Sequence, residues 1–182
     1  MGENTNMEQW DIYDKERKLT DRTMVRGDEF KDGDYHLVVH VCIFNTKGEM
    51  LIQHRQPFKK GWSNLWDVTV GGSAVVGDNS QNAIERELFE EIGYACDFSA
   101  ERPFVTVNYD KGFDDWYIIE RDISIADLSL QYEEVQAVEW ADQSKILRLI
   151  GEGKFIPYYP SFIEMLFQMK NQRGCIVKEP QT

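Results

Sequence analysis

Residues 72–94 read GSAVVGDNSQNAIERELFEEIGY, and this segment decides how the rest of the chain is interpreted. Its central part, residues 80–92, carries apolar residues at helical spacing. Polar residues at 78–80 can cap the start of a helix, and Gly93 is placed to end it. We therefore expect a helix over about residues 80–92.

Three carboxylates gather on one side of this expected helix. At about 100° per residue, Glu87, Glu90 and Glu91 fall within an arc of about 100°, with Glu91 at the edge of the apolar stripe. Acidic side chains at these spacings repel one another, and no lysine or arginine lies within the arc. A bound divalent cation would relieve the repulsion, because Mg²⁺ prefers hard oxygen ligands. The alternative is a solvated acidic face, which is what most runs of charge are.

A glycine pair precedes the helix and favours the metal interpretation. Gly71 and Gly72 follow an expected strand at residues 66–70, and glycine lets the backbone approach a ligand closely. We expect the strand to stop at this pair and a loop to lead from it into the helix.

Strand patterns lie on both sides of this segment. Residues 35–44, YHLVVHVCIF, are apolar and β-branched, typical of a strand buried on both faces, and residues 49–54 are expected to return as its hairpin partner. Further strands are expected at residues 10–13, 19–25, 104–108, 116–121 and 135–140, and further helices at 142–150 and after Pro160. Strands and helices do not alternate regularly, so the pattern indicates an α/β fold with helices on a mixed sheet.

Composition limits the classes of protein to consider. The 182 residues are 42% hydrophobic and 29% charged, which suits one soluble domain in the cytoplasm. No apolar run approaches the roughly 20 residues that cross a bilayer, so no membrane partner is expected. The three cysteines are dispersed, and Cys42 is expected to be a small core residue. A net charge of -12 argues against binding a nucleic-acid polymer, but it allows a small phosphorylated ligand beside a divalent cation.

The same segment, residues 72–94, resembles the Nudix box: a glycine, five residues, a glutamate, seven residues, Arg-Glu, an apolar residue, any residue, Glu-Glu, any residue, glycine and an apolar residue. The resemblance implies the Nudix fold, an α/β/α sandwich around a mixed sheet. It also implies one Nudix domain over residues 1–182, with an N-terminal β-hairpin at about 8–26 and a C-terminal helix at about 160–171. The reaction implied is hydrolysis of a small-molecule diphosphate, namely a nucleoside diphosphate linked to another moiety.

The resemblance also implies roles for individual residues. Glu87, Glu90 and Glu91 would bind Mg²⁺, or Mn²⁺ in its place, and the Gly72 carbonyl would be a further ligand. Arg86 would brace the loop before the helix.

The acid that pairs with this arginine in the family is a glutamate, whereas the chain has the shorter Asp78. The proton of the attacking water would be taken by Glu87 or by a carboxylate outside the box. For the second possibility the candidate is Glu134 of the pair Glu133-Glu134, and a plain surface acid is the alternative there.

A narrower likeness connects the chain to the branch related to isopentenyl-diphosphate isomerase. It rests on short matches spread over roughly residues 8–141. The isomerases need a catalytic cysteine and a metal-binding histidine around the box glycine, and this chain has Gly71 and Ser73 there. His36 matches one isomerase ligand, but one ligand does not make that site. Hydrolase chemistry is therefore expected, and isomerase activity is not.

Two further questions stay open at the level of sequence. Arg55 and either Lys59 or Lys60 are reasonable diphosphate contacts, and a homodimer is possible. Aromatic residues near the expected site could stack on a flat group or simply form core or dimer contacts; they are Phe58, Trp62, Trp66, Tyr109, Phe113, Trp116 and Tyr117. The alternative to an enzyme is a catalytically silent Nudix-fold binding or regulatory module, which would usually lack some of the box carboxylates.

Overall fold

The computed structural model describes residues 8–171 and 174–176, so the outermost ends of the expected domain lie outside the described residues. The chain divides into two compact units, each assembled from segments that are far apart in sequence. The first comprises Met1–His40, Gly71–Phe89 and Ala95–Tyr117, and the second comprises Val41–Val70, Glu90–Tyr94 and Ile118–Thr182. One helix, α1, and three strands, β3, β6 and β8, contribute residues to both units.

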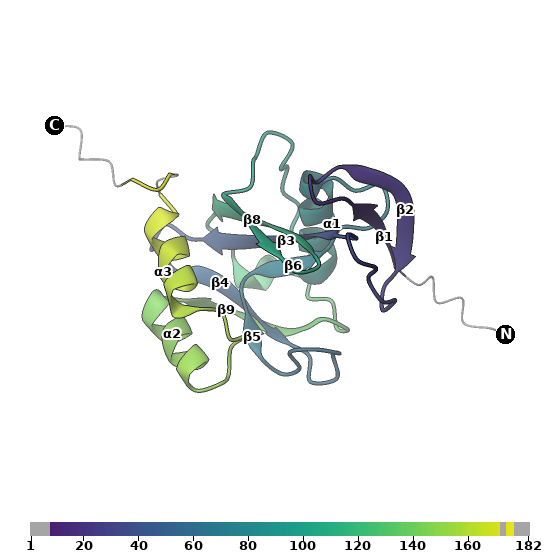
Figure 1. Ribbon diagram of the computed structural model, residues 1–182. Coiled ribbons are helices and arrows are strands. Elements are labelled where there is room, and N and C mark those ends of the chain that lie inside the picture. The colour runs from purple at the N-terminus through teal and green to yellow at the C-terminus, as the bar shows by residue number, and fades with distance from the viewer. Residues whose placement is uncertain (1–7, 172–173, 177–182) are drawn as a thin grey trace. The chain divides into compact units, whose positions relative to one another are not determined.

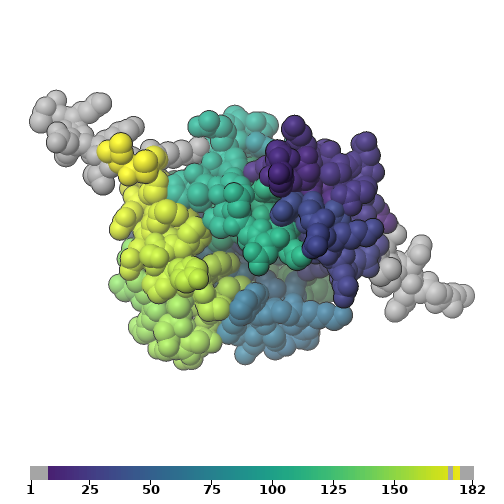
Figure 2. All heavy atoms as spheres, in the orientation of Figure 1, coloured from purple at the N-terminus to yellow at the C-terminus, as the bar shows by residue number. Residues whose placement is uncertain are grey.

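The N-terminal part of the first unit is a β-hairpin. Strand β1 (Gln9–Tyr13) pairs antiparallel with β2 (Leu19–Val25), with Trp10 opposite Met24 and a register shift between Asp11 and Tyr13. The hairpin appears in purple in Figures 1 and 2, where its residues form part of the molecular surface.

A second antiparallel pair in this unit differs from the sequence prediction. Strand β7 (Val105–Tyr109) turns tightly into β8 (Gly112–Glu120), with Tyr109 opposite Gly112. The strand expected to start at residue 116 therefore starts four residues earlier. Its polar start, Asp114-Asp115, hid the strand, because acidic residues are rare in strands.

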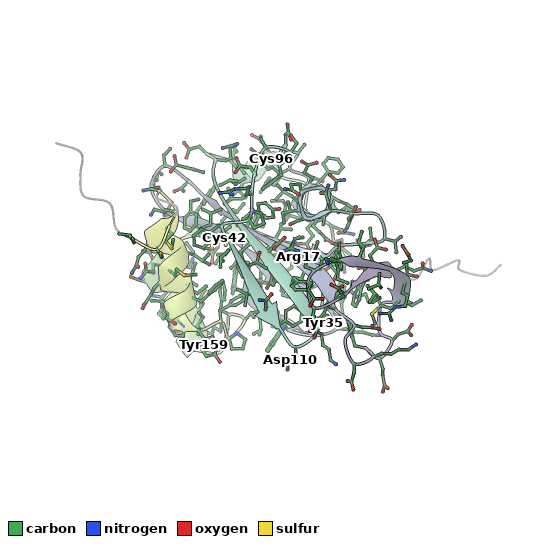
Figure 3. The ribbon with its side chains drawn as sticks, turned by 45° about the horizontal axis from the view of Figure 1, so that its top comes forward. Arg17, Tyr35, Cys42, Cys96, Asp110 and Tyr159 are labelled. Atoms are coloured by element: carbon green, nitrogen blue, oxygen red, sulfur yellow. The ribbon has the colours of Figure 1, made fainter. Side chains whose placement is uncertain are left out.

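Asp115 is fully buried because three side chains satisfy its carboxylate. Arg17 donates two hydrogen bonds to it, the shorter from Nη2, and Thr106 Oγ1 and Ser80 Oγ each donate one at 2.6 Å. Arg17 lies in the hairpin turn with a positive φ of 60° and is labelled in Figure 3. A buried carboxylate is tolerated only with such partners, so the acid in β8 depends on residues far away in sequence.

The segment before the helix also departs from the expectation. Residues 66–70 do not form one strand that stops at the glycines. Instead β5 (Trp66–Asp67) is short, and β6 (Val70–Ser73) continues through Gly71 and Gly72. Strand β6 pairs with β3 (His36–Phe44), a long-range pairing that a local glycine signal does not reveal.

In the second unit, β4 (Met50–Arg55) is the central strand. It pairs antiparallel with β5 and with β9 (Val135–Ala141), so that Gln53 is opposite both Asp67 and Val138. The expected hairpin with β3 is present, with Phe44 opposite Met50. Helices α2 (Gln143–Gly151) and α3 (Pro160–Met169) contact each other, as Figure 1 shows.

Local signals explain where the helices begin and end. Helix α1 runs from Ser80 to Ile92 as expected. Of the candidate caps, Asn79 accepts a hydrogen bond from the backbone N–H of Asn82 at 2.8 Å, and Gly93 follows the helix with a φ of 69°. Asp142 caps α2 by accepting from Lys145 N–H.

Each unit buries apolar side chains. Ile84 and Leu88 of α1 in the first unit are fully buried, and so are Ile92 and, as expected, Cys42 in the second. A short 3₁₀ turn, η1, covers Ile125–Asp127. In the described residues the hydrogen-bonded strand order is β5-β4-β3-β8-β7, with β6 on β3 and β9 on β4. The predicted α/β fold class with a mixed sheet is thus confirmed.

Candidate active site

In the first unit, Gly72 of β6 lies directly beneath the carboxylate of Glu87 from α1. A Cβ atom added to Gly72 would lie 2.2 Å from Cδ of Glu87 and 2.3 Å from its Oε1. Only glycine allows this approach, because real Cβ atoms do not come within 3.0 Å of other heavy atoms. The two residues of the box that are expected to meet at a cation are therefore in contact.

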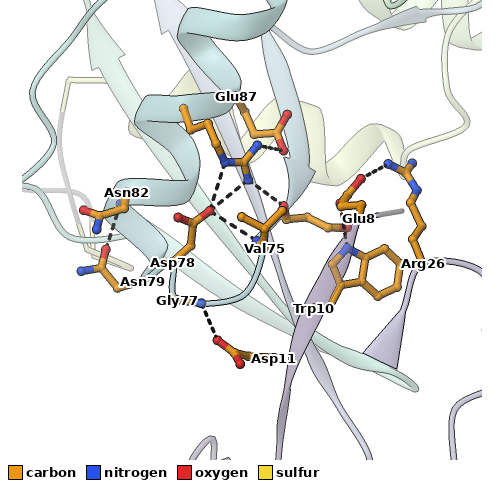
Figure 4. Close-up of polar contacts among 12 residues, drawn as sticks. Glu8, Trp10, Asp11, Arg26, Val75, Gly77, Asp78, Asn79, Asn82 and Glu87 are labelled. Carbon is orange, nitrogen blue, oxygen red and sulfur yellow. Dashed lines mark hydrogen bonds and ion pairs between the residues drawn. The ribbon is translucent and has the colours of Figure 1, made fainter. Parts of the chain in front are cut away.

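Arg86 braces the loop between β6 and α1, and Figure 4 labels Asp78 and Glu87, the two acids that it contacts. Its Nε and Nη2 donate to Asp78 Oδ2 at 3.1 and 3.0 Å, and Nη2 also donates to the Ser73 carbonyl at 3.0 Å. Its Nη1 donates to Glu87 Oε1 at 3.0 Å. Burial alone would lower the pKa of Arg86, but the adjacent Glu87 and Asp78 carboxylates raise it, so the guanidinium stays charged. The shorter acid at position 78 thus still reaches the arginine.

In the second unit, the last turn of α1 carries Glu90 and Glu91 in different surroundings. Glu90 is exposed, whereas Glu91 is buried at 5% exposure. Gln53 of β4 donates from Nε2 to Glu91 Oε2 at 2.9 Å, and Gln53 itself is only 1% exposed. Sequence reasoning missed this contact. The signal available was one polar residue after the apolar run Met50-Leu51-Ile52, which does not identify a partner.

The other face of β6 holds a histidine. His40 Nδ1 lies 2.7 Å from Asp114 Oδ1, and the imidazole stacks on Trp116 with ring centroids 4.2 Å apart and an angle of 10° between the planes. A Cβ atom on Gly71 would lie 2.2 Å from His40 Cδ2. Neighbouring residues of a strand face opposite sides, so the imidazole lies against Gly71 on one side and the Glu87 carboxylate lies against Gly72 on the other. Sequence reasoning did not single out His40.

His36, the residue that matches an isomerase ligand, is enclosed by aromatic rings. It stacks on Trp10 at 4.4 Å between centroids and contacts Phe30, and its Nε2 lies 2.5 Å from the Tyr109 hydroxyl. Burial lowers its pKa to about 4, so the ring is neutral near pH 7. This environment fits a core histidine.

The expected substrate contacts in the second unit are paired with acids. Lys59 Nζ forms an ion pair with Glu134, the candidate base, and Arg55 Nη1 lies 3.7 Å from Asp67 Oδ2. The side chain of Glu134 is 27% exposed, whereas Glu133 and Lys60 are exposed. The structure thus pairs Glu134, the predicted base, with Lys59, a predicted contact of the substrate phosphates.

The aromatic residues expected near the site divide into two groups. Phe113, Trp116 and Tyr117 are buried core residues. Phe58 and Trp62 are more than half exposed, and Phe58 contacts exposed Tyr132 at 5.7 Å between ring centroids. Tyr109 is 39% exposed, and Trp66 stacks on His54. Core packing therefore accounts for Phe113, Trp116 and Tyr117. The other four, Phe58, Trp62, Trp66 and Tyr109, remain available for stacking on a flat group.

The donor set on α1 fits a hard cation. Within the described ranges, no group of three or more His, Cys, Asp or Glu side chains is arranged so that it could hold a metal ion. Mg²⁺ does not need such a group, because it keeps several waters and takes one or two carboxylates together with substrate phosphates. The half-buried Glu87 and the buried Glu91 are carboxylates of this kind. No helix in the described part of the chain is long and apolar enough to cross a membrane.

Comparison with known proteins supports the same assignment. The family model described as NUDIX domain matches residues 34–161. An uncharacterised Nudix hydrolase of Listeria innocua is 46% identical over 91% of this chain and 96% of its own length. An isopentenyl-diphosphate isomerase of Corynebacterium diphtheriae is 26% identical over 74% of this chain and 78% of its own.

A solved structure shows the same fold. A protein of Deinococcus radiodurans superposes with a TM-score of 0.69, covering 88% of this chain and 98% of that one, at 21% identity. The resemblance found at residues 72–94 is therefore confirmed, together with the enzyme class that it implied. The chain belongs to the Nudix hydrolase family.

Proposed function

We propose that this Nudix hydrolase is a Mg²⁺-dependent enzyme that cleaves the phosphoanhydride bond of a nucleoside diphosphate derivative or a related small-molecule diphosphate. The observation that carries the proposal is the Glu87 carboxylate lying directly on Gly72. Because Gly72 has no side chain, the Glu87 carboxylate packs against the backbone of β6, and carboxylate oxygens are the hard donors that Mg²⁺ prefers. Mn²⁺, which also accepts oxygen ligands, would replace Mg²⁺.

The proposed ligands are Glu87, Glu90 and Glu91, with the Gly72 carbonyl as a further donor. Helix α1 is continuous over Ser80–Ile92, so its own geometry places the three carboxylates on neighbouring positions. When bound, the ion would polarise the diphosphate and neutralise charge that develops on the leaving oxygen. Arg86 holds Glu87 Oε1 and therefore limits where that carboxylate can point.

Glu134 is the proposed general base. Its side chain forms an ion pair with Lys59, and an ionised carboxylate can accept a proton from the attacking water. Lys59 could then also contact the substrate phosphates. The family match over residues 34–161 supports treating the whole chain as one Nudix domain.

The test is a panel of nucleoside diphosphate derivatives assayed with Mg²⁺ or Mn²⁺ on the unmodified chain and on Glu91→Gln. We expect the substitution to nearly abolish turnover of every accepted substrate, while the protein melts close to the unmodified chain. Glu120→Gln, at an exposed acid, is the matched control and should retain activity. Full turnover by Glu91→Gln would refute the ligand assignment, and tight binding of the panel without any turnover would favour a silent binding module.

A further inference from the structure

Gln53 is a buried polar residue held in a rigid place. It lies on β4, which is paired on both sides in the second unit, opposite Asp67 of β5 and Val138 of β9. Its side chain is 1% exposed, so it loses nearly all contact with solvent. A buried amide is costly unless its polar atoms are satisfied. The buried Nε2 and Oε1 atoms of this amide therefore each need a hydrogen-bond partner.

One end of the amide is explained by Glu91. The Nε2 atom donates to Glu91 Oε2 at 2.9 Å, a hydrogen bond to a charged acceptor and thus stronger than one between neutral groups. An ionised carboxylate only accepts hydrogen bonds, so it selects the N–H side of the amide and fixes which way Gln53 faces.

The other end has no hydrogen-bond partner among the described residues. Gln53 Oε1 is buried and accepts no hydrogen bond from any described residue. An unsatisfied buried acceptor next to a carboxylate indicates a ligand that donates hydrogen bonds, and a water molecule is the smallest such donor. The amide would then hold the carboxylate with one end and a water molecule with the other.

We propose that Gln53 is a positioning residue that orients Glu91 and an adjacent water molecule for divalent-cation binding. The inference rests on the proposed function in taking Glu91 as a ligand of the cation. Residues that hydrogen-bond to a metal ligand typically change metal affinity or activity by roughly 10- to 100-fold when removed. The fixed β4 strand supplies the rigidity that such a role requires.

The chain provides a matched control in Gln56. It is also a buried glutamine, 6% exposed, in the same unit, and its Nε2 donates to the Val135 carbonyl at 3.4 Å, not to a carboxylate of α1. Gln53→Met and Gln56→Met both replace an amide by an apolar side chain of similar length. Comparing them separates a loss of buried hydrogen bonding in general from a loss of support for Glu91.

The experiment measures Mn²⁺ binding to the full chain without substrate, by the loss of the free Mn²⁺ signal in electron paramagnetic resonance. We expect Gln53→Met to weaken Mn²⁺ affinity about 10-fold or more, whereas Gln56→Met leaves it within about twofold of the unmodified chain. Thermal melting of all three proteins establishes that they are folded. If Gln53→Met destabilises too strongly to test, Gln53→Asn serves instead, and it should also weaken binding, because its amide is one methylene shorter and withdraws the N–H donor from Glu91 Oε2.

The outcomes separate this inference from the proposed function. Unchanged Mn²⁺ affinity in a folded Gln53 variant, or equal weakening by Gln56→Met, would overturn the positioning role. Proposed hydrolase activity would still stand if Glu91→Gln abolished turnover. Conversely, an unmodified chain whose Mn²⁺ affinity depends on Gln53 but that hydrolyses none of the diphosphate panel would leave the positioning role intact and refute the proposed reaction.

Discussion

Asp78 and Arg86 form a two-point contact in which one carboxylate oxygen, Oδ2, accepts from both Nε and Nη2 of the guanidinium. The glutamate usual at this place in the Nudix box is longer by one methylene, yet the aspartate still closes the contact. It does so because the loop brings residue 78 near the helix, where Asp78 Oδ2 also lies 3.3 Å from the Val75 backbone nitrogen. Aspartate in place of glutamate at position 78 therefore leaves the contact with Arg86 intact.

Removing this acid should weaken both stability and turnover. In Asp78→Ala, Arg86 keeps its bonds to Ser73 and Glu87 but loses a partly buried charged partner. We expect the free energy of unfolding to fall by about 1–3 kcal/mol, measured by urea denaturation. Asp78→Glu, which restores the acid usual in the family, should retain most of the activity. If Asp78→Ala left both the free energy of unfolding and the rate of turnover unchanged, the ion pair would have no structural role.

Gly72→Ala tests the contact that carries the proposed function. The new Cβ would collide with the Glu87 carboxylate, which must then rotate away. Because the obstructed atoms are at the end of a flexible side chain, the protein should fold, while kcat falls roughly 10- to 100-fold. Gly151→Ala is the control, since its Cβ meets no atom within 4 Å. Equal kcat in both variants would contradict the arrangement of Gly72 and Glu87.

The role of Glu134 can be separated from that of its neighbour. Glu134→Gln keeps the shape of the side chain but cannot accept a proton, so we expect kcat to fall by about 100-fold or more. Lys59 should keep a weaker contact with the amide, and KM should change little. The exposed neighbour variant Glu133→Gln should behave like the unmodified chain. A normal kcat in Glu134→Gln would mean that a different group takes the proton.

His36 should make stability depend on pH in a defined window. Burial lowers its folded pKa from 6.5 to about 4, so between these values the unfolded chain binds more protons than the folded one. The stability is fully present above pH 6.5 and is lost as pH falls to about 4, by up to about 3 kcal/mol. Denaturant titrations at several pH values measure this. His36→Phe should flatten the dependence in that window, whereas His54→Gln, outside the aromatic enclosure, should not.

Local signals in the sequence were sufficient for the helix and the box. The limits of α1 and a cap among residues 78–80 follow from residues close together in the chain, whereas Gly72 and Glu87 were expected at one site only through the resemblance to the Nudix box. The start of β8 was missed because Asp115 is stabilised by Arg17, 98 residues away. Gln53 was missed for the same reason, since its partner Glu91 lies 38 residues away. Distant partners change what a polar residue can do in a strand, and no local pattern records them.

The packing of His40 on Gly71 bears on how hydrolase and isomerase activity could have diverged among the related Nudix proteins. Position 71 is where the related isomerases need their cysteine, but any side chain there would meet the imidazole of His40. His40 is itself held by Asp114 and by the face of Trp116, so it cannot easily move aside. A side chain at position 71 would therefore force the imidazole of His40 to shift from its present place. An evolutionary path from this hydrolase to an isomerase would have to replace His40 first.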